Sequence, residues 1–237
     1  MKKVILIVLA VIMLFVSSAC SPSNDLETED AVLDDDSSED VYLVLVNKDH
    51  ILPGDWVQKI ELISDQDPWG NEVKIEKTTL EQFNKLQSAL LKQDVDIRLD
   101  SVYRSVEEQV ALWESFEEEY GEDYCKKYLA EPGYSEHHTG LAVDVCIMKD
   151  GEAINDNDTM LAETELFKKV HELMPEYGFI LRYPEGKESI TGYVYEPWHL
   201  RYVGVDVAKE IAEKNITLEE YLEEAEYRYD KETEESE

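Results

Sequence analysis

Apolar residues recur every three or four positions along several stretches of this 237-residue chain. Within residues 80–92, the side chains of Phe83, Leu86 and Leu90 would fall on one face of an α-helix, because residues with this spacing lie above one another in a helix. The same spacing predicts four further amphipathic helices, of which the first is strongly acidic. They cover residues 106–129, 164–177, 205–214 and 218–228.

Shorter apolar runs, rich in β-branched and aromatic residues, predict strands between these helices. They cover residues 41–46, 96–103, 140–147, 179–183 and 193–203. Helices and strands that mix without regular βαβ alternation are typical of α+β proteins. We therefore expect a single α+β domain, with a small antiparallel sheet flanked by helices.

The two ends of the chain have a different pattern. A basic start, an apolar run over residues 4–16 and small residues before Cys20 are typical of an export signal, although an uncleaved N-terminal anchor is an alternative. Acidic residues and serines then predominate, which predicts a flexible linker. The chain is therefore expected to consist of a signal, a linker, a folded domain and an acidic C-terminal helix and tail, over residues 1–20, 21–40, 41–215 and 216–237.

The formal net charge of −33 argues against nucleic acid as a partner, since no basic patch is present to neutralise phosphates. A ligand that carries a carboxylate would need a local cation in so acidic a chain, and Arg104 is the leading candidate. Arg182 is a second candidate, unless it pairs with one of the many surface acids.

The three cysteines bear on the compartment. Cys20 follows Ser-Ser-Ala and resembles the lipidated cysteine of bacterial lipoproteins, although Ser17 occupies the position where those signals usually have leucine. The remaining Cys125 and Cys146 could form a disulfide in an oxidising compartment, or could simply be buried. We therefore expect an extracytoplasmic protein, anchored by lipid to the outer face of the bacterial cell membrane.

Two short segments carry the residue types of a catalytic zinc site: S-E-H-H-T-G-L-A-V-D at residues 135–144 and E-P-W-H at residues 196–199. Three of the five histidines lie in them. One histidine of the first segment, together with Asp144 and His199, would leave a tetrahedral zinc with the open position that catalysis requires. Glu196 would then be a base beside the ligands.

Each segment taken alone also has a structural explanation. The first could hold a loop histidine and an aspartate that caps a strand, and its adjacent His137 and His138 compete for the ligand role. The second could be a turn at a strand edge, with Trp198 in the core. Pro197 favours an extended Glu196 and interrupts any regular strand, so the break could direct Glu196 toward the same cavity as the histidine that follows.

Taken together, the two segments resemble the signature of the VanY-type D-alanyl-D-alanine carboxypeptidases, zinc peptidases related to L,D-carboxypeptidases and D-Ala-D-Ala dipeptidases. The resemblance extends to Tyr103-Arg104-Ser105 with Glu108-Gln109, and covers residues 41–207. It implies one zinc ion per chain, lying on the sheet. It assigns His137, Asp144 and His199 as the metal ligands and Glu196 as the general base. It assigns Arg104 as the cation that stabilises the substrate or its oxyanion. The residues that it places in the substrate groove are Ser135, Gln109, Tyr103 and Trp198.

The resemblance also implies the reaction. The expected protein is a zinc-dependent D,D-carboxypeptidase that hydrolyses the C-terminal D-Ala-D-Ala bond of peptidoglycan stem peptides, with Glu196 as the general base. One alternative is an L,D-carboxypeptidase, dipeptidase or endopeptidase on the same scaffold. Another is a lipoprotein that binds zinc or the cell wall without catalysis.

Overall fold

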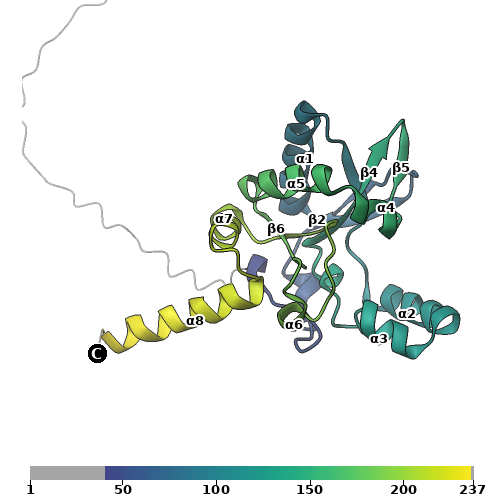
Figure 1. Ribbon diagram of the computed structural model, residues 1–237. Helices are drawn as coiled ribbons and strands as arrows, with labels where there is room; N and C mark the ends of the chain where they lie inside the picture. The colour runs from purple at the N-terminus through teal and green to yellow at the C-terminus, as the bar shows by residue number, and fades with distance from the viewer. Residues whose placement is uncertain (1–40, 236–237) are drawn as a thin grey trace, which may run out of the picture. The chain divides into compact units, whose positions relative to one another are not determined.

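The computed structural model describes residues 41–235 (Figure 1). The predicted signal, the acidic linker and Cys20 lie outside the described residues, so the expected division of the chain and its lipid anchor stay predictions. Cys125 and Cys146 are both buried and do not form a disulfide with each other. None of the described helices is both long enough and apolar enough to cross a membrane.

The described chain contains two antiparallel sheets, which confirms the predicted α+β class. The larger sheet has the order β3-β4-β7-β6, and β5 pairs with β4. The smaller sheet is the hairpin of β1 and β2, which the sequence did not predict. The strands are β1 (Leu62–Gln66), β2 (Glu72–Glu76), β3 (Ile97–Ser101), β4 (Ala142–Lys149), β5 (Glu152–Ile154), β6 (Phe179–Leu181) and β7 (His199–Tyr202).

Helices α1 and α5 lie next to each other, and α1 contacts strand β3 of the larger sheet (Figure 1). The α-helices are α1 (Lys77–Leu90), α2 (Val106–Tyr120), α3 (Glu122–Tyr128), α4 (Asn157–Ala162), α5 (Thr164–Leu173), α6 (Glu188–Thr191), α7 (Val205–Lys214) and α8 (Leu218–Glu235). Short 3-10 helices are η1 (Val41–Leu43), η2 (Trp56–Gln58), η3 (Leu91–Gln93), η4 (Glu136–Thr139) and η5 (Met174–Tyr177).

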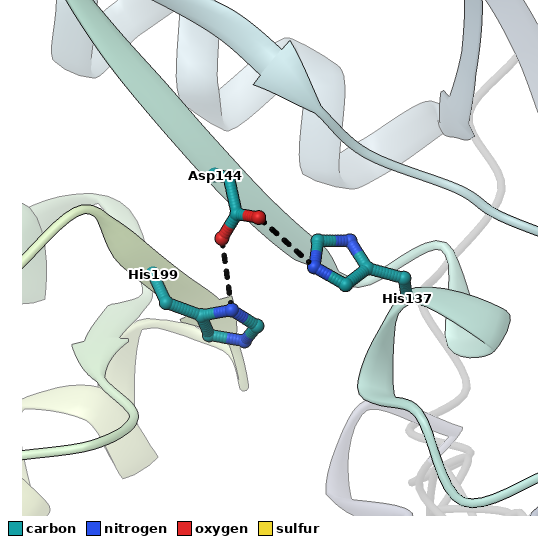
Figure 2. A group of neighbouring side chains, drawn as sticks. All are labelled: His137, Asp144 and His199. Atoms are coloured by element: carbon teal, nitrogen blue, oxygen red, sulfur yellow. Dashed lines mark ion pairs between the residues drawn. The ribbon is translucent and has the colours of Figure 1, made fainter. Parts of the chain in front are cut away.

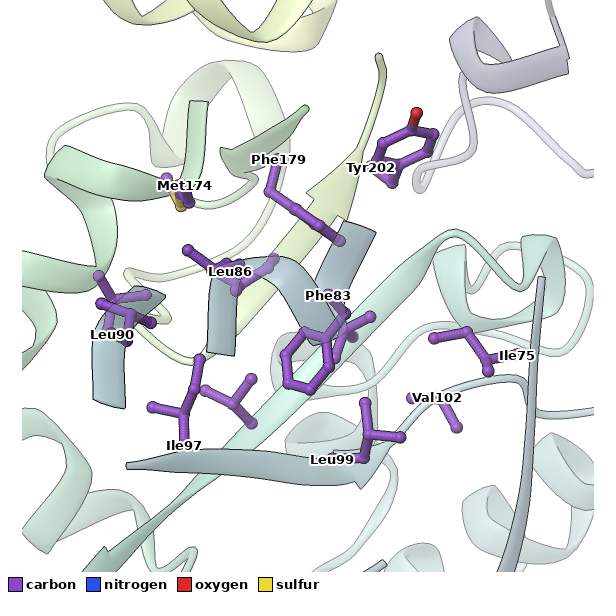
Figure 3. Close-up of a cluster of buried hydrophobic side chains, with 14 of the residues drawn as sticks. Ile75, Phe83, Leu86, Leu90, Ile97, Leu99, Val102, Met174, Phe179 and Tyr202 are labelled. Carbon is purple, nitrogen blue, oxygen red and sulfur yellow. The ribbon is translucent and has the colours of Figure 1, made fainter. Parts of the chain in front are cut away.

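The hydrophobic core lies between α1, α5 and one face of the larger sheet. Phe83, Leu86 and Leu90 of α1 are buried against Ile97 and Phe179 of the strands (Figure 3). Full burial of such a side chain contributes about 1.5–3 kcal/mol. The periodicity of residues 80–92 therefore reflects a helix whose apolar face packs on the sheet.

The two faces of β4 and β7 have different characters, because successive side chains of a strand point to opposite faces. Val143 of β4 is paired with Leu200 of β7, and both belong to the hydrophobic core. The next pair, Asp144 and His199, therefore lies on the other face. One face of this strand pair stabilises the fold, and the other carries polar groups.

The predicted strand over residues 41–46 is wrong. Its first residues form η1, and the segment joins neither sheet. Its backbone carbonyls instead accept hydrogen bonds from a side chain: Arg201 Nη2 donates to Tyr42 O at 3.0 Å and to Val44 O at 2.7 Å. An arginine from β7 thus takes the place of a strand partner.

Two further predictions need correction. The helix predicted over residues 106–129 is divided at Gly121, where φ is 89° and ψ is 162°, so α2 ends and α3 begins there. The strand predicted over residues 193–203 shrinks to β7, because Pro197 has no N–H to donate to a sheet.

Candidate metal centre

Three side chains converge at one end of the larger sheet: His137 and Asp144 from adjacent elements, and His199 from a segment 55 residues after Asp144 (Figure 2). His137 Nε2 lies 3.2 Å from Asp144 Oδ2, and His199 Nδ1 lies 2.9 Å from Asp144 Oδ1. One ligand atom from each of the three residues lies within 4.8 Å of the others. Among the described residues, this is the group of His, Cys, Asp and Glu side chains that could hold a metal ion.

The backbone explains this convergence. Asp144 and His199 are directly opposite each other in the antiparallel pair of β4 and β7, which places their side chains next to each other on one face. His137 reaches the same point from η4, which connects to β4 through Gly140. Gly140 has φ of 71°, and a Cβ atom there would lie 2.9 Å from the side chain of Leu62. The glycine therefore permits a turn that a larger residue would strain.

The donor set fits a catalytic zinc ion. Asp144 Oδ1 is buried and makes no hydrogen bond with the described residues, although His199 Nδ1 lies only 2.9 Å away. A carboxylate oxygen and a ring nitrogen at this distance can share a cation, which can be a proton or a metal ion. Two imidazoles and one carboxylate also leave an open coordination position, as catalytic zinc sites require.

Hydrogen bonds distinguish the two adjacent histidines that the local sequence left open. His137 Nδ1 lies 2.7 Å from Val102 O, so this nitrogen carries the proton and Nε2 is free for a metal. His138 uses both ring nitrogens elsewhere: Nδ1 lies 2.6 Å from Arg104 O, and Nε2 accepts from Gly133 N at 3.1 Å. His138 accordingly lies outside the cluster.

The charges within the cluster favour a cation. Burial by itself would raise the pKa of Asp144, yet the neighbouring imidazoles hold it well below its ordinary value. Burial by itself would lower the pKa of His199, but the carboxylates of Asp144 and Glu136 raise it to about 10. The carboxylates thus attract a proton to His199, and a metal ion can replace that proton.

Glu196 lies beside this cluster. The peptide N–H of His199 donates to Glu196 O at 3.2 Å, and this turn brings Glu196 Oε2 to 4.0 Å from His199 Nδ1. Burial, with a smaller contribution from Asp144, raises the pKa of Glu196 to about 7. A carboxylate with a pKa near neutrality can both accept and return a proton.

Arg104 is held next to His137, whose carbonyl accepts a hydrogen bond from Arg104 N at 3.1 Å. Its guanidinium donates to Gln109 Oε1 at 2.8 Å and to Ser101 Oγ at 2.7 Å. With Tyr103, it lines a cavity of about 770 Å³. None of the three residues of the metal cluster lines this cavity. Val102 does line it, and the Val102 carbonyl oxygen lies 2.7 Å from His137 Nδ1.

The other predicted substrate-binding residues lie outside this lining. Gln109 is buried behind Arg104, with its amide nitrogen on Ala130 O at 2.7 Å, so it supports the guanidinium. Ser135 is buried directly before η4. Trp198 is half-buried against the core.

Arg182 is not paired with surface acids. Its side chain is fully buried and pairs with two buried carboxylates, Glu136 and Glu219, so it is not free to bind a substrate. Sequence reasoning missed this pairing, because the partners come from segments without a common motif. It also did not predict that the Tyr183 ring would lie on His199, with ring centroids 4.7 Å apart.

Comparison with known proteins identifies the family. The family model of VanY, D-alanyl-D-alanine carboxypeptidase, matches residues 72–205. The putative carboxypeptidase YodJ of Bacillus subtilis (strain 168) is 37% identical over 205 residues, which cover 84% of this chain and 73% of that protein. The bifunctional D-Ala-D-Ala dipeptidase and carboxypeptidase VanXYC of Enterococcus gallinarum is 48% identical over 128 residues, covering 53% of this chain and 66% of that one.

Solved structures agree with these relatives. The LdcB LD-carboxypeptidase has a TM-score of 0.65 at 37% identity, over 76% of this chain and 84% of that one. A variant of the vancomycin-resistance D,D-pentapeptidase VanY, in complex with Zn(II), has a TM-score of 0.63 at 31% identity, over 77% of this chain and 99% of that one. With its fold, its cluster and its matched sequence, the chain belongs to the VanY family of D-alanyl-D-alanine carboxypeptidases.

Proposed function

We propose that this protein is a zinc-dependent D,D-carboxypeptidase that removes the last D-alanine from peptidoglycan stem peptides. The observation that carries the proposal is the position of Glu196, a carboxylate beside a cluster of two histidines and one aspartate. A structural zinc site would close its fourth position with another ligand and would need no base. The Zn(II) bound by the related VanY structure supports the choice of metal.

In this proposal His137, Asp144 and His199 hold the metal. When bound, zinc lowers the pKa of a coordinated water to about 7 and polarises a peptide carbonyl. Glu196 accepts the proton of the attacking water at its carboxylate and returns it to the amine of the departing D-alanine.

Arg104 provides the cation that the substrate requires. A carboxypeptidase substrate ends in a negative charge, and the net charge of −33 would otherwise repel it. The guanidinium is held by Gln109 and Ser101 and lines the cavity next to the cluster. Arg104 therefore binds the terminal carboxylate or stabilises the oxyanion.

A second candidate is an L,D-carboxypeptidase, which acts on stems that have already lost one D-alanine. The likeness to the LdcB LD-carboxypeptidase, at 37% identity, specifically favours this alternative. Both reactions would use the same metal, base and cation, so the residues described above do not separate them.

Defined stem peptides separate the two candidates. We expect the zinc-loaded protein to release D-alanine from a pentapeptide stem much faster than from a tetrapeptide stem, as measured by quantifying free D-alanine. Preferential cleavage of the tetrapeptide would instead establish the L,D-carboxypeptidase. Release from neither peptide would overturn the carboxypeptidase proposal and favour a protein that binds zinc or the wall without catalysis.

The pH dependence should report on Glu196. The carboxylate must be unprotonated to act as a base, so kcat/KM should fall about tenfold per pH unit below its pKa. Burial raises that pKa from 4.5 to about 7, and the charge of bound zinc moves it back toward 4.5. We expect the midpoint of the acidic limb between these two values. A profile of kcat/KM that stays flat down to pH 4.5 would contradict the role of Glu196.

A further inference from the structure

Glu136 lies on the far side of His199 from Asp144, and its side chain is fully buried. Its Oε2 atom lies 3.2 Å from His199 Nε2. Its Oε1 atom accepts hydrogen bonds from Arg182 Nε at 2.6 Å and from Arg201 Nη1 at 2.7 Å. One buried carboxylate therefore joins a ring of the candidate metal centre to two arginines.

The two arginines are themselves fixed. Arg182 donates two further hydrogen bonds to Glu219 of α8, at 2.9 and 2.6 Å, while Arg201 binds backbone carbonyls of the segment around η1. The two arginines form a buried group with Glu136 and Glu219, in which two positive and two negative formal charges balance. Two positively charged N–H donors lie within hydrogen-bonding distance of Glu136 Oε1, an environment that favours an ionised carboxylate.

An ionised carboxylate can only accept hydrogen bonds. The ring nitrogen that faces Glu136 must therefore carry a proton, which fixes His199 with its hydrogen on Nε2. A neutral imidazole has one proton, so the lone pair of Nδ1 then points toward Asp144 and the metal position.

We propose that Glu136 is a positioning residue for the metal centre, which fixes both the tautomer and the ring orientation of His199. This inference rests on the zinc site of the proposed function. Glu136 directly precedes His137 in the chain. Two neighbouring residues therefore serve the metal centre in different ways: His137 is a ligand, and Glu136 contacts the outer nitrogen of another ligand, His199. Partners of this kind typically change metal affinity by about 10- to 100-fold when they are removed.

Glu136→Gln tests the proposal through its effect on the tautomer. The two arginine N–H groups would hold the amide oxygen of the new glutamine side chain, so its NH₂ group would face His199 Nε2. That donor favours a lone pair on Nε2 and moves the imidazole proton to Nδ1, where zinc must bind. We expect zinc to bind about 10- to 100-fold more weakly, as measured by competition with a chromophoric chelator.

Glu219→Gln is the matched control. It also removes a buried carboxylate from Arg182, but it does not touch His199. Both variants should unfold at lower temperature without metal, whereas only Glu136→Gln should lose zinc affinity. Equal losses of zinc affinity in the two variants, or no loss in Glu136→Gln, would overturn the assignment and leave the proposed function intact.

A measurement on the unmodified protein covers the case in which Glu136→Gln does not fold. Imidazole ¹⁵N chemical shifts of the zinc-loaded full chain should show His199 protonated at Nε2 and bound to zinc through Nδ1. His137 should show the opposite arrangement, because its Nδ1 faces Val102 O. Zinc on Nε2 of His199 would overturn the proposal, and a chain that binds no zinc would overturn the metal centre itself.

Discussion

Glu196→Gln is expected to reduce kcat for D-alanine release by about 100- to 10,000-fold while zinc stays bound. Glutamine has nearly the same shape as glutamate but cannot accept the proton of the attacking water. Glu196 is not one of the three grouped ligands, so its replacement leaves His137, Asp144 and His199 in place. Turnover of a pentapeptide stem and zinc content per chain are the two measurements required.

A suitable control is Glu176→Gln, which alters an exposed carboxylate that pairs with Lys209 at 2.8 Å. This variant should retain both turnover and zinc. If Glu196→Gln kept full turnover, the general base would have to be another group. If it lost zinc together with turnover, Glu196 would be a ligand, and the three-residue metal site would need revision.

The sequence predicted those elements whose stability comes from a regular apolar face. Residues 205–214 form α7 as expected, and residues 80–92 largely coincide with α1, because both helices bury one side against neighbouring elements. The apolar residues 41–46 have the composition of a strand but no strand partner. Their carbonyls are bound by Arg201, more than 150 positions later in the chain, and periodicity contains no signal for such a contact.

The candidate site was predictable to a similar degree. Residue types and motifs identified the segments of the metal cluster, and the family resemblance selected His137. Local sequence could not select it, because the choice depends on Val102 O and Arg104 O, which come from an earlier part of the chain. The role inferred for Glu136 depends on Arg182, so it becomes visible only in three dimensions.

Asp144→Asn should remove zinc and with it activity. The amide keeps the shape of the side chain but loses the negative charge, which provides the one anionic ligand of the cluster. The backbone pairing of β4 with β7 does not depend on that charge, so the fold should remain. We expect zinc affinity to fall by more than the roughly 100-fold that follows loss of a ligand's hydrogen-bonding partner. Zinc content after dialysis and kcat/KM at limiting zinc measure this effect.

Asp100→Asn separates a lost ligand from a general loss of negative charge. Asp100 is near enough to Asp144 for their charges to interact, yet it accepts a hydrogen bond from Asn155 and is not part of the metal cluster. Its replacement should weaken zinc binding far less than Asp144→Asn does, because Asp100 supplies no ligand atom and its charge acts on the metal only through the distance between them. If both asparagine variants lost zinc equally, Asp144 would act through its field alone, and the metal would need a different third ligand.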